Sequence, residues 1–150
     1  MFKKVLVAFL IAVCIASSAF AIDIKDSTGT TTSITVASTT TVYSGWFRMD
    51  TGAYAAVAYM ISSDAGVADV TIQLQQSPIN PDDAGVSDPD FQIPVNMADI
   101  VTALTTESTW YYQSMPFLPF EYARFKLTGI GSNSADTIVK IKVVQMGSVR

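Results

Sequence analysis

The alternation of apolar and polar residues predicts strands along most of the chain, most clearly at residues 68–75. Val70, Ile72 and Leu74 alternate there with polar residues. Successive side chains of a strand point to opposite faces of a sheet, so this spacing is typical of a strand with one buried face. We expect the three aliphatic side chains to enter a core. The polar ones should face solvent or a partner, and they are Asp69, Thr71, Gln73 and Gln75.

Other segments carry the same pattern or a variant of it. Residues 122–128 and 137–145 alternate between apolar and polar side chains and predict two strands with one wet face. Residues 54–62 are apolar on both faces, which is typical of a strand that is covered on both sides. Residues 44–49 and 54–62 flank the turn residues 50–52, so together they predict a hairpin.

The region of residues 22–43 is rich in Thr and Ser, and it predicts two short strands around a turn at 26–29. Its main apolar positions are Ile22, Ile24, Ile34 and Val36. These four are candidates for self-assembly, because an extended segment can add to the open sheet edge of a neighbouring molecule. The alternative is that the segment pairs within its own domain.

About eight short strands, separated by turns and without a long helical pattern, predict an all-β fold: an antiparallel two-sheet sandwich that is jelly-roll-like. Residues 70–78 and 122–129 resemble paired strands of small jelly-roll domains. Such domains recur in galactose-binding-like modules and in phage and extracellular structural proteins. The resemblance implies a sandwich that binds or assembles, and it transfers no ligand residues.

Residues 1–21 have the pattern of a secretory signal peptide. Lys3 and Lys4 precede an apolar run at residues 5–15, and small residues end the segment at Ala19 and Ala21. The apolar run is short for a membrane span, so we expect none to remain after cleavage. Removal of 21 residues from 150 leaves 129, enough for a single domain over residues 22–150. We therefore expect a secreted protein, extracellular or on the surface of a prokaryotic cell.

The net charge limits the possible partners, and the cysteine content limits how the fold can be stabilised. The net charge of −4 becomes about −6 when Lys3 and Lys4 leave with the signal peptide, which argues against a nucleic-acid partner. Cys14 is the only cysteine, and it lies in the signal peptide. Burial and backbone hydrogen bonds must therefore hold the domain without disulfides.

The composition also argues against an enzyme. The sequence has no histidine, and after the signal peptide no cysteine, so it lacks the commonest general base, the thiol nucleophile and the usual zinc ligands. Glu107 and Glu121 could each pair with an aspartate as in a glycosidase. With thirteen carboxylates such a pairing is expected by chance, so we predict no catalysis.

One loop and one set of aromatic residues are candidate binding sites. Oxygen ligands for calcium are concentrated near Asn80, and the candidates are Asp82, Asp83, Asp88 and Asp90. The alternative is a solvated acidic loop, and we expect no other cofactor. A platform that stacks on sugar rings could form from Trp46, Trp110, Tyr111 and Tyr112. The alternative for these residues is the hydrophobic core.

Three functions follow from these patterns, in order of preference. The first is a secreted structural subunit that self-assembles into a filament, tube or surface coat, with other copies of itself as partners. The second is a carbohydrate-binding or adhesion module. The third is a phage-derived virion component, against which the signal peptide argues, because virion proteins assemble in the cytoplasm.

Overall fold

A computed structural model describes most of the chain after the predicted signal peptide. The described residues are 20–49, 54–63, 70–83, 100, 108–115, 120–130 and 136–146. They contain nine strands: β1 (Phe20–Asp23), β2 (Ile34–Val36), β3 (Thr41–Tyr43), β4 (Phe47–Arg48), β5 (Tyr54–Ser63), β6 (Val70–Ser77), β7 (Trp110–Met115), β8 (Tyr122–Gly129) and β9 (Thr137–Met146). Every strand pair is antiparallel, so the predicted all-β class is confirmed.

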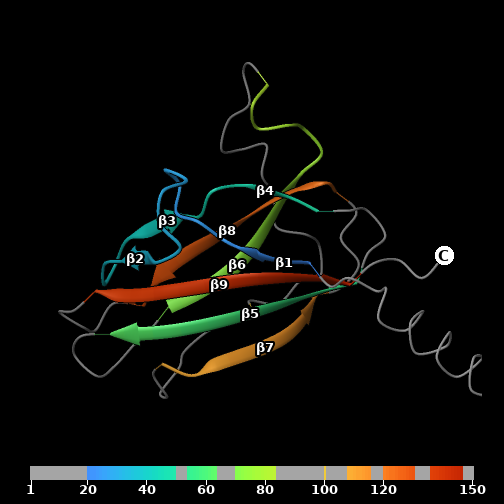
Figure 1. Ribbon diagram of the computed structural model, residues 1–150. Coiled ribbons are helices and arrows are strands. Elements are labelled where there is room, and N and C mark those ends of the chain that lie inside the picture. Colours follow the sequence, from blue (N-terminus) through green and yellow to red (C-terminus); the bar gives the residue numbers. More distant parts are fainter. Residues whose placement is uncertain are drawn as a thin grey trace, which may run out of the picture.

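The larger sheet has five strands. β1 and β2 lie one after the other along one edge of β9, β5 pairs with the other edge of β9, and β7 pairs with β5. The β5–β9 ladder runs from Tyr54 opposite Met146 to Ser63 opposite Thr137. Figure 1 shows β9, β5 and β7 side by side. The predicted cover on both faces of β5 holds fully only for the inner face, where Val57, Tyr59 and Ile61 are buried, because Ala56 and Met60 of the outer face are only partly buried.

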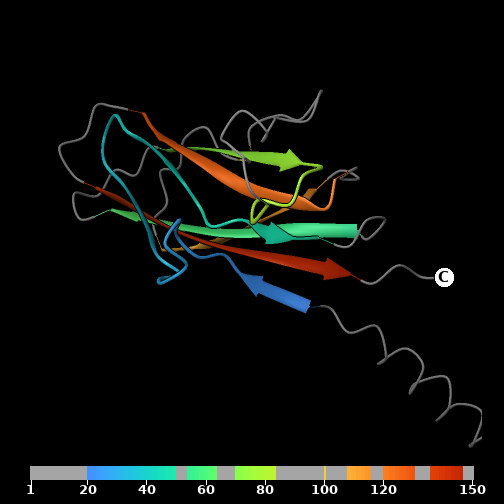
Figure 2. The ribbon, with the colours of Figure 1, turned by 90° about the horizontal axis from the view of Figure 1, so that it is seen from above.

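The smaller sheet has four strands. β3 and β4 follow one another along one edge of β8, and β6 pairs with the other edge. Figure 2 shows β6 and β8 in a layer above β5, β9 and β1. The two sheets stack face to face, and the strand order matches the predicted jelly-roll-like sandwich.

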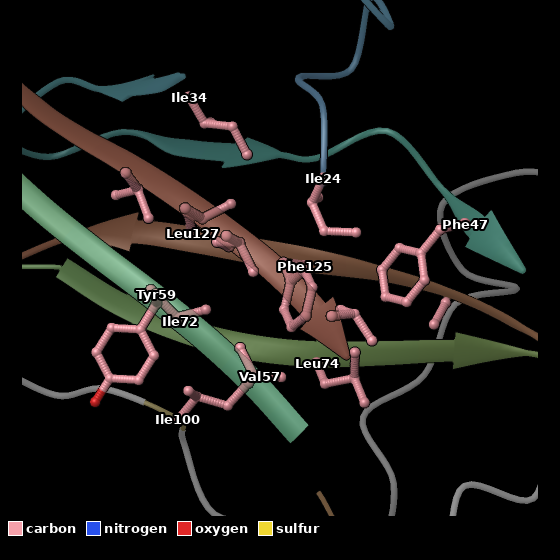
Figure 3. Close-up of a cluster of buried hydrophobic side chains, with 14 of the residues drawn as sticks. Ile24, Ile34, Phe47, Val57, Tyr59, Ile72, Leu74, Ile100, Phe125 and Leu127 are labelled. Carbon is pink, nitrogen blue, oxygen red and sulfur yellow. The ribbon is translucent and has the colours of Figure 1, made fainter. Parts of the chain in front are cut away.

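The inner faces of both sheets form one hydrophobic core (Figure 3). The alternating residues of β6 and β8 contribute as predicted, since Val70, Ile72 and Leu74 are fully buried opposite Leu127 and Phe125. Phe125 also stacks on Phe47, with 5.4 Å between the ring centroids. The contacts that hold the sheets together are thus made by the apolar half of each alternating pattern.

The predicted hairpin of residues 44–62 is wrong. β4 pairs with β8, at Phe47 opposite Ala123, whereas β5 pairs with β7 and β9. The chain therefore crosses from the smaller to the larger sheet between β4 and β5. A turn between two apolar segments has the same sequence pattern whether it joins neighbours in one sheet or strands of two sheets, so local pattern did not separate the two cases.

Two polar residues of the predicted wet faces are buried. Arg124 of β8 and Gln75 of β6 are each only 8% exposed. The Nε of Arg124 donates a hydrogen bond to Oε1 of Gln75 (2.9 Å), and its guanidinium lies 4.0 Å above the ring of Tyr43. The expectation that Gln75 faces solvent is therefore corrected, because the side chain of Arg124 and the ring of Tyr43 cover this part of the sheet.

The N-terminal segment closes one side of the sandwich. Ile24 donates its N–H to the carbonyl of Ile141 in the larger sheet (2.9 Å), and Asp26 forms an isolated bridge with Ser44. Ser44 in turn donates its N–H to the carbonyl of Phe125 in the smaller sheet (2.9 Å). Backbone hydrogen bonds therefore link the two sheets along the side where β1 to β4 lie.

Residues 1–19 of the predicted signal peptide lie outside the described residues. β1 begins at Phe20, two residues before the expected cleavage point. Cleavage after Ala21 would leave Ile22 and Asp23 in place opposite Val143 and Lys142.

Candidate functional site

The outer face of the larger sheet carries the polar and aromatic half of the alternating pattern. On this face Met60 of β5 lies between Trp110 of β7 and Lys140 of β9. In the next row Ala58 lies between Tyr112 and Lys142, and Lys142 is also opposite Asp23 of β1. Four strands thus place aromatic, cationic and anionic side chains on a single surface.

A hollow of about 350 Å³ lies on this surface. The side chains that line it are Asp23, Thr32, Met60, Trp110, Lys140 and Lys142, with Ile141 below them. We call it the Trp110 hollow. Its volume is at the lower end of the range for small-ligand sites, enough for about one or two sugar rings.

The charges of the Trp110 hollow are arranged around one ion pair. The Nζ of Lys142 lies 3.1 Å from Oδ1 of Asp23 and 5.6 Å from the centroid of the Trp110 ring. The side chains of Lys142 and Asp23 are 43% and 57% exposed, so water screens this pair. Lys140 forms no ion pair with any residue that the structure describes.

The structure separates the four aromatic residues that were predicted to form a sugar platform. Trp110 and Tyr112 lie on the outer face of the larger sheet, and Tyr112 is 73% exposed. Tyr111 points to the inner face and stacks on Tyr59, at 5.6 Å between ring centroids. Trp46 lies beside the smaller sheet and packs edge to face against Tyr122 at 5.8 Å. Only Trp110 and Tyr112 therefore share a surface.

The neighbouring positions of Trp110 and Tyr112 suit an extended ligand. Residues two apart along a strand are about 6.6 Å apart on the same face. Indole and phenol rings combine apolar area with a polar tip, which is the combination that sugar rings contact. The strict alternation of residues 110–112 was the signal that could have separated Tyr111 from the other two.

The assembly candidates lie within their own sandwich. β1 and β2 pair with β9 of the same chain, and Ile24, Ile34 and Val36 are at most 3% exposed in the core. Ile22 packs against that core and is partly buried. The alternative that the segment pairs within its own domain is the arrangement seen.

The described half of the calcium candidate is a turn. Asp82 and Asp83 are exposed, and their N–H groups donate to the side chain and the carbonyl of Asn80, respectively. Asp88 and Asp90 lie outside the described residues. Within the described ranges, no three acidic, His or Cys side chains come close enough together to hold a metal ion.

Gln76 is a buried polar residue that the sequence pattern did not single out. Its side chain is 1% exposed, and neither its Nε2 nor its Oε1 has a hydrogen-bond partner among the residues that the structure describes. It follows Val70, Ile72 and Leu74 in the alternation and lies opposite Ala123, so it points into the core. Burying an amide without partners costs free energy, so Gln76 is a polar group that the core holds at a cost.

The described part of the chain has no helix of a length and apolarity that would cross a bilayer.

Comparison with known proteins relates this chain to bacterial adhesin domains by fold. No protein-family model matches the chain, and no curated protein is significantly similar to it in sequence. Among solved structures, the K3 cleaved adhesin domain of Lys-gingipain from Porphyromonas gingivalis is 15% identical, with a TM-score of 0.52 over 88% of this chain and 92% of that domain. The K1 cleaved adhesin domain of the same protein is 12% identical, with a TM-score of 0.50 over 89% and 92%. At this identity the likeness confirms the sandwich fold, and it supports neither a galactose-binding-like nor a phage family.

Proposed function

We propose that this chain is an exported, non-enzymatic adhesion module that binds carbohydrate through the Trp110 hollow. The observation that carries the proposal is the position of Trp110 beside the exposed ring of Tyr112, at a hollow lined by charged and hydroxyl side chains. A sugar ring can stack its C–H face on the indole. Its hydroxyl groups can then exchange hydrogen bonds with Asp23, Thr32 and Lys140 at the rim.

Fold and composition support the same proposal. The chain shares its fold with two domains described as cleaved adhesin domains, which is an argument by analogy. A signal peptide at residues 1–21 would deliver the domain outside the cell, where an adhesion module works. The lack of histidine favours binding over catalysis. This function replaces self-assembly as the preferred one, because the segment expected to join neighbouring molecules is paired inside its own sandwich.

A glycan array followed by calorimetric titration of the best ligand tests the proposal. Trp110→Ala should weaken binding at least tenfold, because one stacked aromatic ring is removed from the hollow. Trp46→Ala is the matched control, since it removes an equally large ring from the other sheet. Thermal unfolding of both variants checks that they fold. An array without hits, or a Trp110→Ala variant that binds as well as the unchanged chain, would show the proposal to be wrong.

Self-assembly remains a second candidate because of the position of β7. β7 is the last strand of the larger sheet, and among the described residues no strand pairs with its outer side. It has no charged residue and no proline, the features that usually protect an edge strand from pairing with another molecule. A strand of a second copy could extend the sheet there.

Light scattering and electron microscopy over a range of concentrations test this second candidate. If β7 joins copies, Ser114→Lys should shift the protein toward the monomer, because a charge on an edge strand opposes pairing. Thr39→Lys, in the exposed turn between β2 and β3, adds the same charge elsewhere and should change nothing. A protein that is monomeric at every concentration would remove this candidate.

A further inference from the structure

We propose that the Trp110 hollow selects saccharides that carry a carboxylate, and that Lys140 binds this carboxylate. The inference rests on the proposed carbohydrate function and names the class of ligand. It starts from the charges of the described residues that line the hollow, which are two ammonium groups and one carboxylate. Asp23 and Lys142 neutralise each other across 3.1 Å. No described carboxylate pairs with Lys140, so the described lining of the hollow carries one excess positive charge.

Of the other described cations, Lys25 and Lys126 also lack a described ion pair, but neither lines the hollow. Arg48 is paired with Glu121, and Arg124 is buried between Gln75 and the ring of Tyr43. The chain as a whole has a net charge of −4. The negative net charge of the protein therefore does not attract an acidic ligand from a distance. Lys140 must act at short range, within the Debye length of about 8–10 Å.

The register of the strands puts Lys140 at a suitable distance from Trp110. Both residues lie opposite Met60, one on each side of it. Neighbouring strands are about 4.8 Å apart, so their Cα atoms are separated by roughly 10 Å. A sugar ring stacked on Trp110 covers about half of this distance. A carboxylate at the ring edge then lies above Met60, within reach of the flexible Lys140 side chain.

The Asp23–Lys142 pair limits the ligand on the other side. Asp23 would repel a second carboxylate, and the ammonium group of Lys142 lies 3.1 Å from Asp23 and 5.6 Å from the centroid of the Trp110 ring. One acidic group directed at Lys140 is thus favoured over a densely charged ligand. Met60 lies between Trp110 on one side and Lys140 on the other, and its apolar side chain suits the C–H face of a sugar.

Matched pairs of ligands test the inference by calorimetric titration. Each pair consists of an oligosaccharide with a single uronic-acid residue, such as galacturonate, mannuronate or glucuronate, and the same oligosaccharide with that carboxyl group reduced to an alcohol. At low salt the acidic member of at least one pair should bind roughly fivefold more tightly, because partly exposed ion pairs contribute little more than this. The preference should disappear in 1 M NaCl, where the Debye length is about 3 Å.

Variants connect the preference to Lys140. Lys140→Gln should bind both members of the pair equally, while Lys126→Gln, which removes one charge from the other sheet, should keep the preference. If acidic and reduced members bind equally and Trp110→Ala weakens both, the inference is wrong and the proposed function stands. If no acidic member binds, the inference is also wrong, and the glycan array alone decides the proposed function. A preference that survives in Lys140→Gln overturns the role of this lysine.

Discussion

At the scale of single residues, Asp26 organises the turn between β1 and β2. Its Oδ1 accepts hydrogen bonds from the N–H of Thr30 (2.9 Å), the N–H of Thr31 (3.3 Å) and the hydroxyl of Thr28 (2.9 Å). The hydrogen bond from Thr30 contributes most to holding the pKa of Asp26 below its ordinary value of 3.8. The ionised carboxylate therefore stabilises the folded turn.

This pKa shift predicts a pH dependence of stability. Because the folded pKa is lower than the unfolded one, the contribution of Asp26 is complete above about pH 3.8 and is lost as the pH falls through the folded pKa. Asp26→Asn should be less stable than the unchanged chain at pH 7, and the difference should shrink as the pH falls below 3.8. Urea unfolding between pH 7 and 2.5 measures it. Asp83→Asn, at an exposed turn, is the control, and a difference independent of pH would contradict the prediction.

The raised pKa of Tyr59 predicts that stability falls at high pH. Burial of its phenol raises its pKa above the ordinary value of 10.0, and the nearby Tyr111 adds to this effect. The unfolded chain thus loses this proton first, so stability is retained below about pH 10 and falls as the pH rises toward the folded pKa. Tyr59→Phe, which cannot ionise, should lose less stability between pH 9 and 11.5. Denaturant titrations over this range measure it, and parallel losses in both proteins would argue against the prediction.

The sequence predicted which residues point into the core better than it predicted which polar side chains are exposed. The inward aliphatic residues of β6 and β9, such as Ile72 and Ile141, all lie in the core, whereas Ile138 and Val144 of β9 break the alternation and are only partly buried. Burial of Arg124 was not predictable, because its cover comes from Tyr43, a residue 81 positions earlier on a different strand. Whether a polar side chain on an outer face is exposed depends on its neighbours in space, which local alternation does not contain.

At the scale of elements, the packing around Gly129 at the end of β8 leaves no room for a side chain. A Cβ at this position would lie 2.5 Å from the carbonyl oxygen of Ala37 and 2.8 Å from that of Ser38. The N–H of Gly129 also donates to the carbonyl of Thr40 (3.0 Å), so the turn between β2 and β3 is packed closely against β8. Both clashing atoms belong to the backbone, which cannot move away as a side chain does.

Gly129→Ala should therefore destabilise the domain by about 3 kcal/mol, the upper end of the range for overpacking. Gly29→Ala is the matched comparison. Gly29 has a φ of +71°, but no atom lies within 4 Å of the point that an alanine methyl group would occupy, so alanine there costs only the left-handed backbone, about 1 kcal/mol. Chemical denaturation of both variants gives the order. A smaller loss for Gly129→Ala than for Gly29→Ala would show that this turn can shift.

At the scale of the whole molecule, the sandwich was predictable and the site was not. Alternating strands without helical periodicity leave two stacked sheets as the simple way to bury one face of each. The Trp110 hollow, in contrast, combines residues from β1, β5, β7 and β9. Their register depends on which strands become neighbours, and the wrong hairpin at residues 44–62 shows that sequence order does not reveal this. Trp110 was singled out for its chemistry, whereas Asp23, Lys140 and Lys142 required the fold.

The partner of the N-terminal segment distinguishes two forms of the molecule. If the segment pairs with β9 of its own chain, the domain is closed, and if it pairs with β9 of a neighbouring chain, the molecules are linked into a polymer. Thr35 of β2 lies opposite Ile138 of β9, and cross-strand neighbours are close enough for a disulfide or a short bis-maleimide link. The chain from residue 22 onward has no cysteine, so Thr35→Cys with Ile138→Cys introduces the only two thiols.

We expect the link to form within one chain and to give a compact monomer on non-reducing gels, because β1 and β2 complete the core of their own sandwich. Each single-cysteine variant controls for random coupling between chains. A ladder of linked oligomers from the double variant alone would mean that neighbouring molecules exchange this segment, since only then do Thr35 and Ile138 of different chains lie opposite one another.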